Sequence, residues 1–148
     1  MNDVDPFIAE VVPRLRADVE AVHNGDIGPR LELWSHEEPV TLFGAMFSAK
    51  GRTDVEAVFE KLATTFFGSR GLDYEVVAAG SSGDLGYVVA LEHSSVATTE
   101  EGTKSYTLRV TTVLRREDGV WKVVHRHGDG LPADGVQSVA RQTPHAVP

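Results

Sequence analysis

The sequence predicts an α+β fold in which helices come first and an antiparallel sheet follows. Three observations support this prediction. Apolar residues recur at helical spacing from Phe7 to Val22. Four segments between residues 72 and 129 alternate in polarity as strands do. Short turn sequences rich in glycine and aspartate separate those segments, which indicates a meander of consecutive strands. Helices and strands are thus segregated along the chain, as in α+β domains.

Three helices are expected in the N-terminal half of the chain. The first covers residues 7–22, with Asp5 as its cap and Pro6 at the first helical position. Pro13 lies inside the pattern, so a kink or a later start is possible. A second helix covers 27–34 and has Asp26 as its cap. The third begins after Thr53, where Thr53 to Glu56 reads as a capping box. Its buried face would carry Val55, Val58, Phe59, Leu62 and Phe66.

The strands are expected to follow these helices closely. An extended segment at 40–43 and a short strand within 44–51 come before the third helix. The long strands are predicted at residues 72–79, 85–98, 103–116 and 120–129. After Leu131 the sequence has no periodicity. We therefore expect one domain over residues 1–131 and a loosely ordered tail over 132–148.

Two turns set the expected register of the sheet. Pairing Glu117 with Val120 places Thr112 opposite His125. Pairing Thr98 with Thr103 assigns the residues of the shared middle strand to the same face, so the two registers agree. A β-bulge would invert part of this pattern. The face that the helices would cover then holds Tyr87, Val89, Leu91, His93, Leu108, Val110, Thr112, Leu114, Trp121, Val123, His125 and His127.

The last predicted strand carries the main candidate chemistry. Along one side it changes from apolar residues to His125, His127 and Asp129, and the register brings His93 to the same end. A histidine with a pKa near neutrality can act as a general base, and a carboxylate can orient it. We therefore expect His127 and His93 as acid or base, with Asp129 as the orienting group. The alternative is that these histidines are buried structural groups.

A ligand pocket is expected beside these histidines. The residues predicted to contact a small hydrophobic substrate are Trp34, Phe59, Tyr87, Thr112 and His125. The His-x-His pattern could also bind zinc or iron. However, alternate residues of a strand lie ~6–7 Å apart at their backbones. We expect neither a metal nor another cofactor.

The composition excludes several classes of protein. The net charge of −8 argues against general nucleic-acid binding, which needs a basic surface. There are no cysteines, so disulfides and thiolate metal sites are excluded. No apolar run approaches the ~20 residues of a membrane-spanning helix, and the acidic N-terminus lacks a signal core. A cytoplasmic protein with no membrane partner is expected.

The final hairpin carries a family resemblance. N-terminal helices followed by a meander that ends in Trp121-x-Val123-x-His125-x-His127 resemble the nuclear transport factor 2-like superfamily, above all its SnoaL-like and ketosteroid isomerase-like members. Residues 115–127 are also similar to the end of the calcium/calmodulin-dependent kinase association domain. The resemblance covers residues 7–130. It implies a cone-shaped barrel of curved sheet and helices, one deep pocket and frequent dimers.

Two functions are compatible with this resemblance. The first is an isomerase, cyclase or hydratase that acts by histidine-mediated proton transfer on a hydrophobic organic substrate, without a redox cofactor. The second is a non-catalytic ligand-binding or assembly module of the same fold. A homodimer is expected through the sheet face that carries Thr107, Arg109, Thr111, Val113 and Val124.

Overall fold

The computed structural model describes residues 5–98 and 102–131. The predicted tail, residues 132–148, lies outside the described residues. In chain order the elements are α1 (Pro6–His23), α2 (Gly28–Leu33), β1 (Thr41–Phe43), β2 (Ser48–Lys50), α3 (Arg52–Ala63), β3 (Ser69–Ser82), β4 (Leu85–Thr98), β5 (Gly102–Glu117) and β6 (Val120–Gly130). This order of helices before long strands confirms the predicted α+β class.

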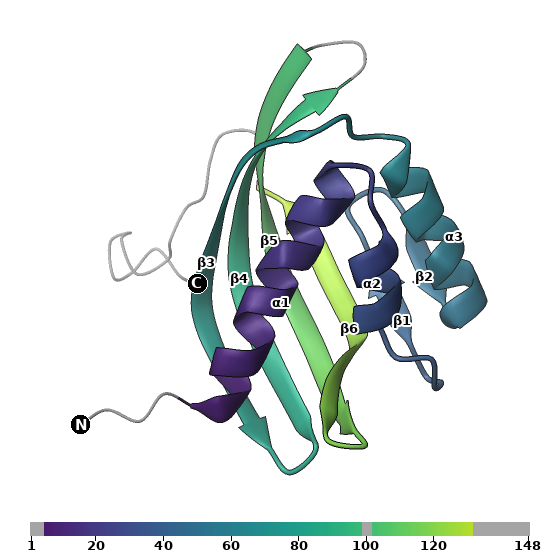
Figure 1. The fold of residues 1–148 in the computed structure, drawn as a ribbon, viewed down its shortest axis with the longest axis vertical. Coiled ribbons are helices and arrows are strands. Elements are labelled where there is room, and N and C mark those ends of the chain that lie inside the picture. The colour runs from purple at the N-terminus through teal and green to yellow at the C-terminus, as the bar shows by residue number, and fades with distance from the viewer. Residues whose placement is uncertain (1–4, 99–101, 132–148) are drawn as a thin grey trace, which may run out of the picture.

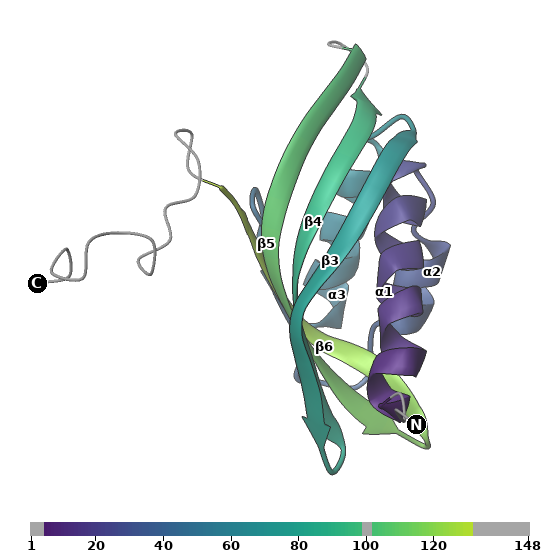
Figure 2. The same cartoon turned by 90° about the vertical axis from the view of Figure 1, so that its left-hand side faces the viewer.

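The strands form one curved sheet in the order β2-β1-β6-β5-β4-β3, and the helices lie along one of its faces (Figures 1 and 2). The sheet is open, so the expected barrel is not closed. One of its pairs, β1 with β6, is parallel, whereas the sequence predicted only antiparallel pairing. Helix α1 crosses in front of the long strands, and α3 lies beside the short strands β1 and β2 (Figure 1).

The helix starts follow the predicted capping only in part. Asp5 caps α1 by accepting from the Phe7 amide at 2.8 Å, and the helix continues through Pro13. Asp26 accepts from the Gly28 amide at 2.9 Å. The capping box at Thr53 is wrong, because α3 starts earlier, at Arg52. The carboxylate that receives the Arg52 amide comes instead from Glu38, at 2.7 Å.

The core lies between the helices and the concave face of the sheet. Buried apolar side chains of α1 meet those of the central strands, and the Phe7 ring packs edge-on against Trp121 at 4.7 Å. Gly86 permits this approach, because an added Cβ would lie 2.4 Å from the Phe7 ring. Burial of such side chains supplies most of the favourable free energy of folding. Further core members are Val11, Leu15, Trp34, Val55, Phe59, Val88, Ala90, Leu114 and Val123.

The predicted register between β4 and β5 is wrong by one residue. Thr98 pairs with Gly102, not with Thr103, so residues 99–101 separate the two paired positions. Because side chains alternate across a strand, this shift turns every side chain of β4 to the opposite face. Val88, Ala90 and Glu92 therefore face the helices. Tyr87, Val89, Leu91 and His93, predicted to be inside, lie on the outer face.

A β-bulge changes the predicted face of β6. The expected pairs hold from Glu117 with Val120 to Leu114 with Val123, but then Val113 pairs with His125 and Thr112 with Arg126. The extra residue inverts the rest of the strand. Arg126 thus faces the helices, and His125 and His127 face outward. The prediction that these histidines lie under the helices is wrong.

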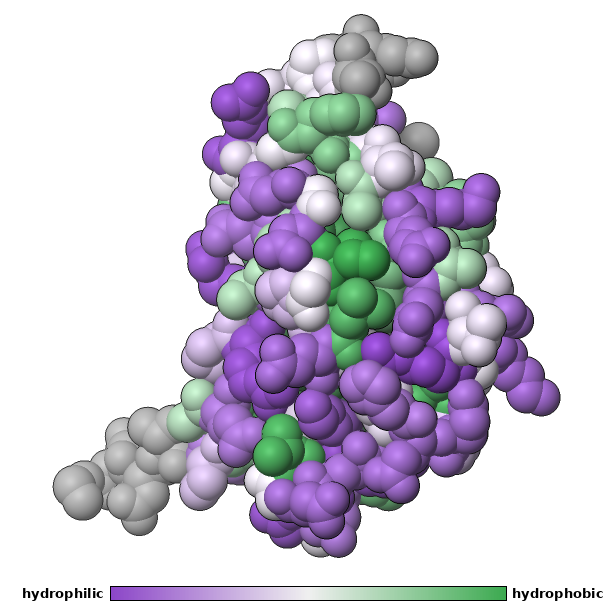
Figure 3. All heavy atoms as spheres, turned by 45° about the vertical axis from the view of Figure 1, so that its right-hand side comes forward, coloured by the Kyte–Doolittle hydropathy of each residue, from purple (hydrophilic) through white to green (hydrophobic). Residues whose placement is uncertain are grey.

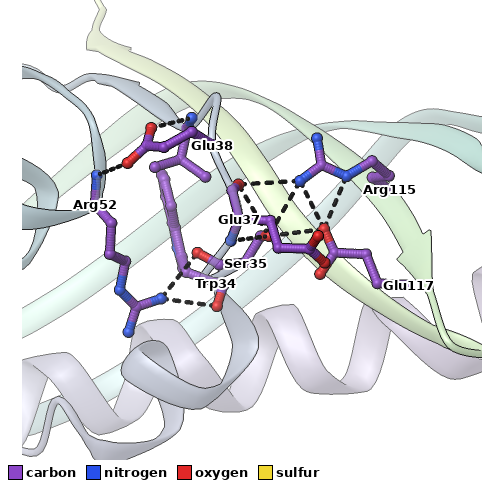
Figure 4. A network of polar contacts seen from close by, with 8 residues as sticks. Trp34, Ser35, Glu37, Glu38, Arg52, Arg115 and Glu117 are labelled. Carbon is purple, nitrogen blue, oxygen red and sulfur yellow. Dashed lines mark hydrogen bonds and ion pairs between the residues drawn. The ribbon is translucent and has the colours of Figure 1, made fainter.

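A polar network joins the segment after α2 to α3 and β5 (Figure 4). The Arg52 guanidinium donates to the carbonyl oxygens of Trp34 and Ser35 at 2.8 and 3.0 Å. The buried Ser35 hydroxyl donates to Glu117 at 2.7 Å, and Arg115 donates to the same carboxylate at 2.8 Å. These bonds satisfy backbone and side-chain groups that burial would otherwise leave unpaired. The network therefore has a structural role and positions Trp34 in the core.

Candidate functional site

His93 lies on the outer face of the sheet. Its Nδ1 contacts the Thr107 hydroxyl at 3.0 Å, and its Nε2 contacts the Glu75 carboxylate at 2.9 Å. The His93 and Glu75 side chains are 37% and 53% exposed. The sequence-predicted cluster of His93 with His127 and Asp129 beneath the helices is therefore not formed.

The histidines of β6 also lie outside. His125 Nδ1 contacts the Thr41 hydroxyl at 2.6 Å, and the Phe43 ring packs edge-on against both His125 and His127. Burial is the largest influence on the pKa of His125 and lowers it. Asp129 accepts from Arg109 at 2.9 Å instead of orienting a histidine. A catalytic role for His93, His127 and Asp129 stays a prediction, and it would have to be exercised on this outer face.

The predicted substrate contacts are dispersed as well. Trp34 and Phe59 pack edge-on at 5.2 Å inside the core, and both are almost fully buried. Thr112 is buried on the inner face between Val88 and Arg126. Tyr87 is 45% exposed on the outer face. None of these residues lines the cavity described next.

A cavity of about 360 Å³ lies between the helices and the inner face of the sheet. Its walls come from the last turns of α1, from α2 and α3, from β1 and the β1–β2 turn, and from β4, β5 and β6. Met46 of that turn is 63% exposed, so the cavity wall reaches the surface there. Figure 3, viewed towards the side of α3 and β2, shows apolar side chains at the surface among polar ones. The apolar lining residues are Val19, Val22, Leu42, Met46, Phe47, Val58, Leu62, Phe66, Val96 and Leu108.

Three residues of two buried ion pairs, Arg30, Glu92 and Arg126, form much of the polar wall of the cavity, and Asp18 holds Arg30 from outside the lining. Arg126 donates through Nη1 and Nη2 to the Glu92 carboxylate at 2.7 and 2.9 Å. Arg30 donates through Nε and Nη2 to Asp18, at 2.8 Å in both bonds. Their side chains are between 2% and 14% exposed. Bidentate arginine–carboxylate pairs of this kind are strong because two parallel hydrogen bonds are reinforced by the attraction between opposite charges. Each charge is cancelled by its neighbour, so the pairs add no net charge to the wall.

The protonation states follow from burial and from these neighbours. Burial alone would raise the pKa of Glu92, but the Arg126 guanidinium and its hydrogen bonds hold it below the ordinary value. Burial would lower the pKa of Arg126, but the Glu92 carboxylate raises it above the usual range. Both groups are therefore charged at neutral pH, and the wall consists of fixed, compensated charges.

His23, the last residue of α1, completes the polar wall with Tyr106. The His23 Nε2 and the Tyr106 hydroxyl lie 2.8 Å apart, while His23 Nδ1 is buried with no partner among the described residues. A histidine at a helix C-terminus is ordinarily favoured as a cation by ~0.3–1 kcal/mol. Burial outweighs this effect and lowers the pKa of His23 to about 4. Burial also raises the pKa of Tyr106 to about 12. Both groups are therefore neutral near pH 7.

The sequence contained a weak signal for these residues. Asp18 lies on the apolar stripe of α1 between Leu15 and Val22, where a charged residue needs a buried partner. Glu92 and Arg126 are also charged residues in long strands, but their faces depend on the register. No spacing in the sequence links Asp18 to Arg30, or Glu92 to Arg126.

Residues 5–98 and 102–131 contain neither a clustered metal site nor a membrane-spanning helix. Within them, no three histidine or carboxylate groups are placed to share one metal ion. No helix among these residues is long and apolar enough to cross a bilayer.

The fold and its inner cavity define a class of small α+β proteins with a helix-covered curved sheet. The SnoaL-like domain family matches residues 14–133, and the chain belongs to this family. A search among curated proteins found no match.

Solved structures share the fold at low sequence identity. A nuclear transport factor 2-like protein from Salmonella enterica serovar Typhimurium has a TM-score of 0.73 at 18% identity, over 91% of this chain and 96% of the other. A ketosteroid isomerase-like protein from Erwinia carotovora atroseptica has a TM-score of 0.71 at 16% identity, over 87% and 99%. The CaMKII hub from S. rosetta has a TM-score of 0.67 at 21% identity, also over 87% and 99%. These likenesses show the fold alone.

Proposed function

We propose that this protein binds a hydrophobic small organic molecule in the cavity between α1, α3 and the sheet. The observation that carries the proposal is a cavity of about 360 Å³ with apolar walls and internally paired charges. Ligand pockets have volumes of ~300–1,000 Å³ and few polar groups among apolar side chains. The family to which the chain belongs is consistent with a ligand-binding or isomerase-like domain.

The proposed activity is proton transfer by the His23–Tyr106 pair, as in an isomerase, cyclase or hydratase. His23 Nδ1 is buried, so the proton would pass through Tyr106: the Tyr106 oxygen takes a proton from the substrate while its own proton moves to His23 Nε2, 2.8 Å away. A base whose pKa is about 4 is weak. It removes only a proton that a neighbouring group of the substrate has already made acidic. The proposed chemistry uses no redox cofactor.

Filling the cavity tests the proposal. Leu62→Trp puts a larger side chain into the lining and should weaken binding of the apolar probe 2-ethylnaphthalene by about tenfold or more, because well-packed space tolerates extra atoms poorly. Leu85→Trp is the matched control, since Leu85 is 55% exposed and lies outside the cavity lining. Calorimetric titration measures both affinities. Equal affinity in wild type and Leu62→Trp, or no binding at all to the wild type, contradicts the proposal.

A second proposal is assembly through the outer face of the sheet. The observation that favours it is the exposed Tyr87, which shares this face with the half-buried Leu91 and Val113. Apolar groups collected on an exposed face are typical of an interface. We propose a homodimer through this face, and light scattering should then give roughly twice the 16.0 kDa of the chain. A particle of 16.0 kDa at micromolar concentration contradicts the dimer.

A further inference from the structure

The two buried arginines do not use all their hydrogen-bond donors in the ion pairs. A guanidinium carries five N–H donors and accepts no hydrogen bonds. Arg126 donates only through Nη1 and Nη2, which leaves its Nε without a partner among the described residues. Arg30 donates only through Nε and Nη2, which leaves its Nη1 in the same condition.

These spare donors reach open space. Within the described residues, the side-chain nitrogen and oxygen atoms that are both buried and unpartnered are His23 Nδ1, Ser69 Oγ and Ser94 Oγ. Neither Arg126 Nε nor Arg30 Nη1 is among them, so both atoms retain accessible surface. Both residues line the cavity, and their side chains are only 14% and 4% exposed. The cavity that both residues line is therefore where these spare donors would meet a ligand.

The spare N–H donors of the two arginines favour a ligand with a hydrogen-bond acceptor. Because the charges of the two ion pairs already cancel, they favour an acceptor without a charge. Asp18 and Glu92 already cancel the two guanidinium charges. Taking a carboxylate out of water against a net-neutral wall would leave one charge uncompensated, at a penalty of several kcal/mol. A carbonyl oxygen has two lone pairs and no charge to desolvate. The remaining charged residue of the lining, Lys104, is exposed, and solvent screens its charge.

We propose that Arg126 determines specificity by donating from its Nε to the carbonyl oxygen of a neutral hydrophobic ligand, and that Arg30 Nη1 supplies a second donor to the polar groups of that ligand. This inference rests on the proposed function, since it needs a ligand in the same cavity. Asp18 and Glu92 act as positioning residues, because their two-point bonds fix the plane of each guanidinium. The selected ligand class is a ketone, aldehyde, ester or amide on an apolar body.

A pair of probes with nearly the same shape tests this selection. 2-Acetylnaphthalene carries a carbonyl oxygen, and 2-ethylnaphthalene lacks it. Arg126→Lys keeps a positive charge beside Glu92 but removes the Nε donor. We expect this variant to bind the ketone about tenfold more weakly, the usual effect of losing a hydrogen bond to a charged donor. Binding of the hydrocarbon should change less than twofold. Arg109→Lys on the outer face is the matched control and should leave both affinities unchanged.

A spectroscopic measurement does not depend on any variant. The carbonyl carbon of ¹³C-labelled 2-acetylnaphthalene should shift downfield on binding to the wild type, relative to the same ketone in hexane, because a hydrogen bond from a guanidinium polarises the C=O bond. A bound carbonyl resonance at the hexane position overturns the inference. Circular dichroism checks that Arg126→Lys is folded, and Arg30→Lys replaces it if it is not.

The outcomes separate the inference from the proposed function. If the wild type binds the hydrocarbon and Arg126→Lys weakens the binding of both probes equally, the inference is overturned. Ligand binding in the cavity is then still supported. Tighter binding of 2-naphthoate than of the ketone, abolished in Arg126→Lys, overturns the choice of a neutral acceptor. Failure of every probe to bind the wild type overturns the proposed function itself. A loss of affinity in Arg126→Lys that is confined to the ketone supports both the inference and the proposed function.

Discussion

Replacing Arg126 with methionine is expected to lower the free energy of unfolding by ~3–5 kcal/mol. The change leaves the Glu92 carboxylate inside the protein, where its side chain is 2% exposed, without the guanidinium that balances its charge and donates a hydrogen bond to each of its oxygens. Urea denaturation followed by circular dichroism measures the loss. This is the largest single effect that the structure predicts.

Two matched variants show whether burial is the cause. Arg109→Met breaks an exposed ion pair with Asp129, in which both side chains are about half exposed, and should change stability by no more than ~1 kcal/mol. The double variant Glu92→Leu with Arg126→Met removes both charges and should recover most of the loss. If Arg126→Met is as mild as Arg109→Met, the Glu92–Arg126 pair is not buried as described.

Stability is expected to fall by ~3 kcal/mol between pH 6.5 and pH 4 because of His23. Burial lowers the pKa of this histidine from 6.5 to about 4, with Glu92 acting in the opposite direction and Arg30 reinforcing burial. Between these values the unfolded chain binds a proton and the folded protein does not. The contribution of His23 is therefore complete above pH 6.5 and is lost as the pH falls to about 4.

The variant His23→Gln isolates this effect from other titrating groups. Glutamine can still hydrogen-bond to Tyr106 but does not titrate, so the difference in stability between wild type and variant should change with pH in this window. Burial also lowers the pKa of His125, and His125→Gln serves as the comparison because that residue is less buried. Chemical denaturation at several pH values provides the data. A difference in stability that stays constant with pH would mean that folding does not lower the pKa of His23, and it would contradict this prediction.

Most of the fold could be predicted because it depends on local patterns. The helical spacing from Phe7 to Val22 and the cap at Asp5 gave α1, and the alternation of the strands gave β3 to β6. These signals act within a few residues of one another. The parallel pairing of β1 with β6 was not predicted, because it joins segments far apart in the chain and no turn connects them.

The site could not be predicted, because it depends on register. One residue fewer at the β4–β5 turn and one bulge in β6 exchange the inner and outer faces. Glu92 and Arg126 then replace His93 and His125 beneath the helices. From the sequence alone the histidines are the stronger catalytic candidates, because the ordinary pKa of histidine lies near neutrality and those of glutamate and arginine do not. The buried pairing that places Glu92 and Arg126 at the cavity is visible only in three dimensions.

The position of a bound probe tests the central claim most directly. A crystal structure of the protein with 2-acetylnaphthalene should show the naphthalene rings between α1, α3 and the inner face of the sheet. Its carbonyl oxygen should lie within hydrogen-bond distance of Arg126 Nε. A probe found instead against His93 or His127 on the outer face, with the inner cavity unoccupied, would contradict the account.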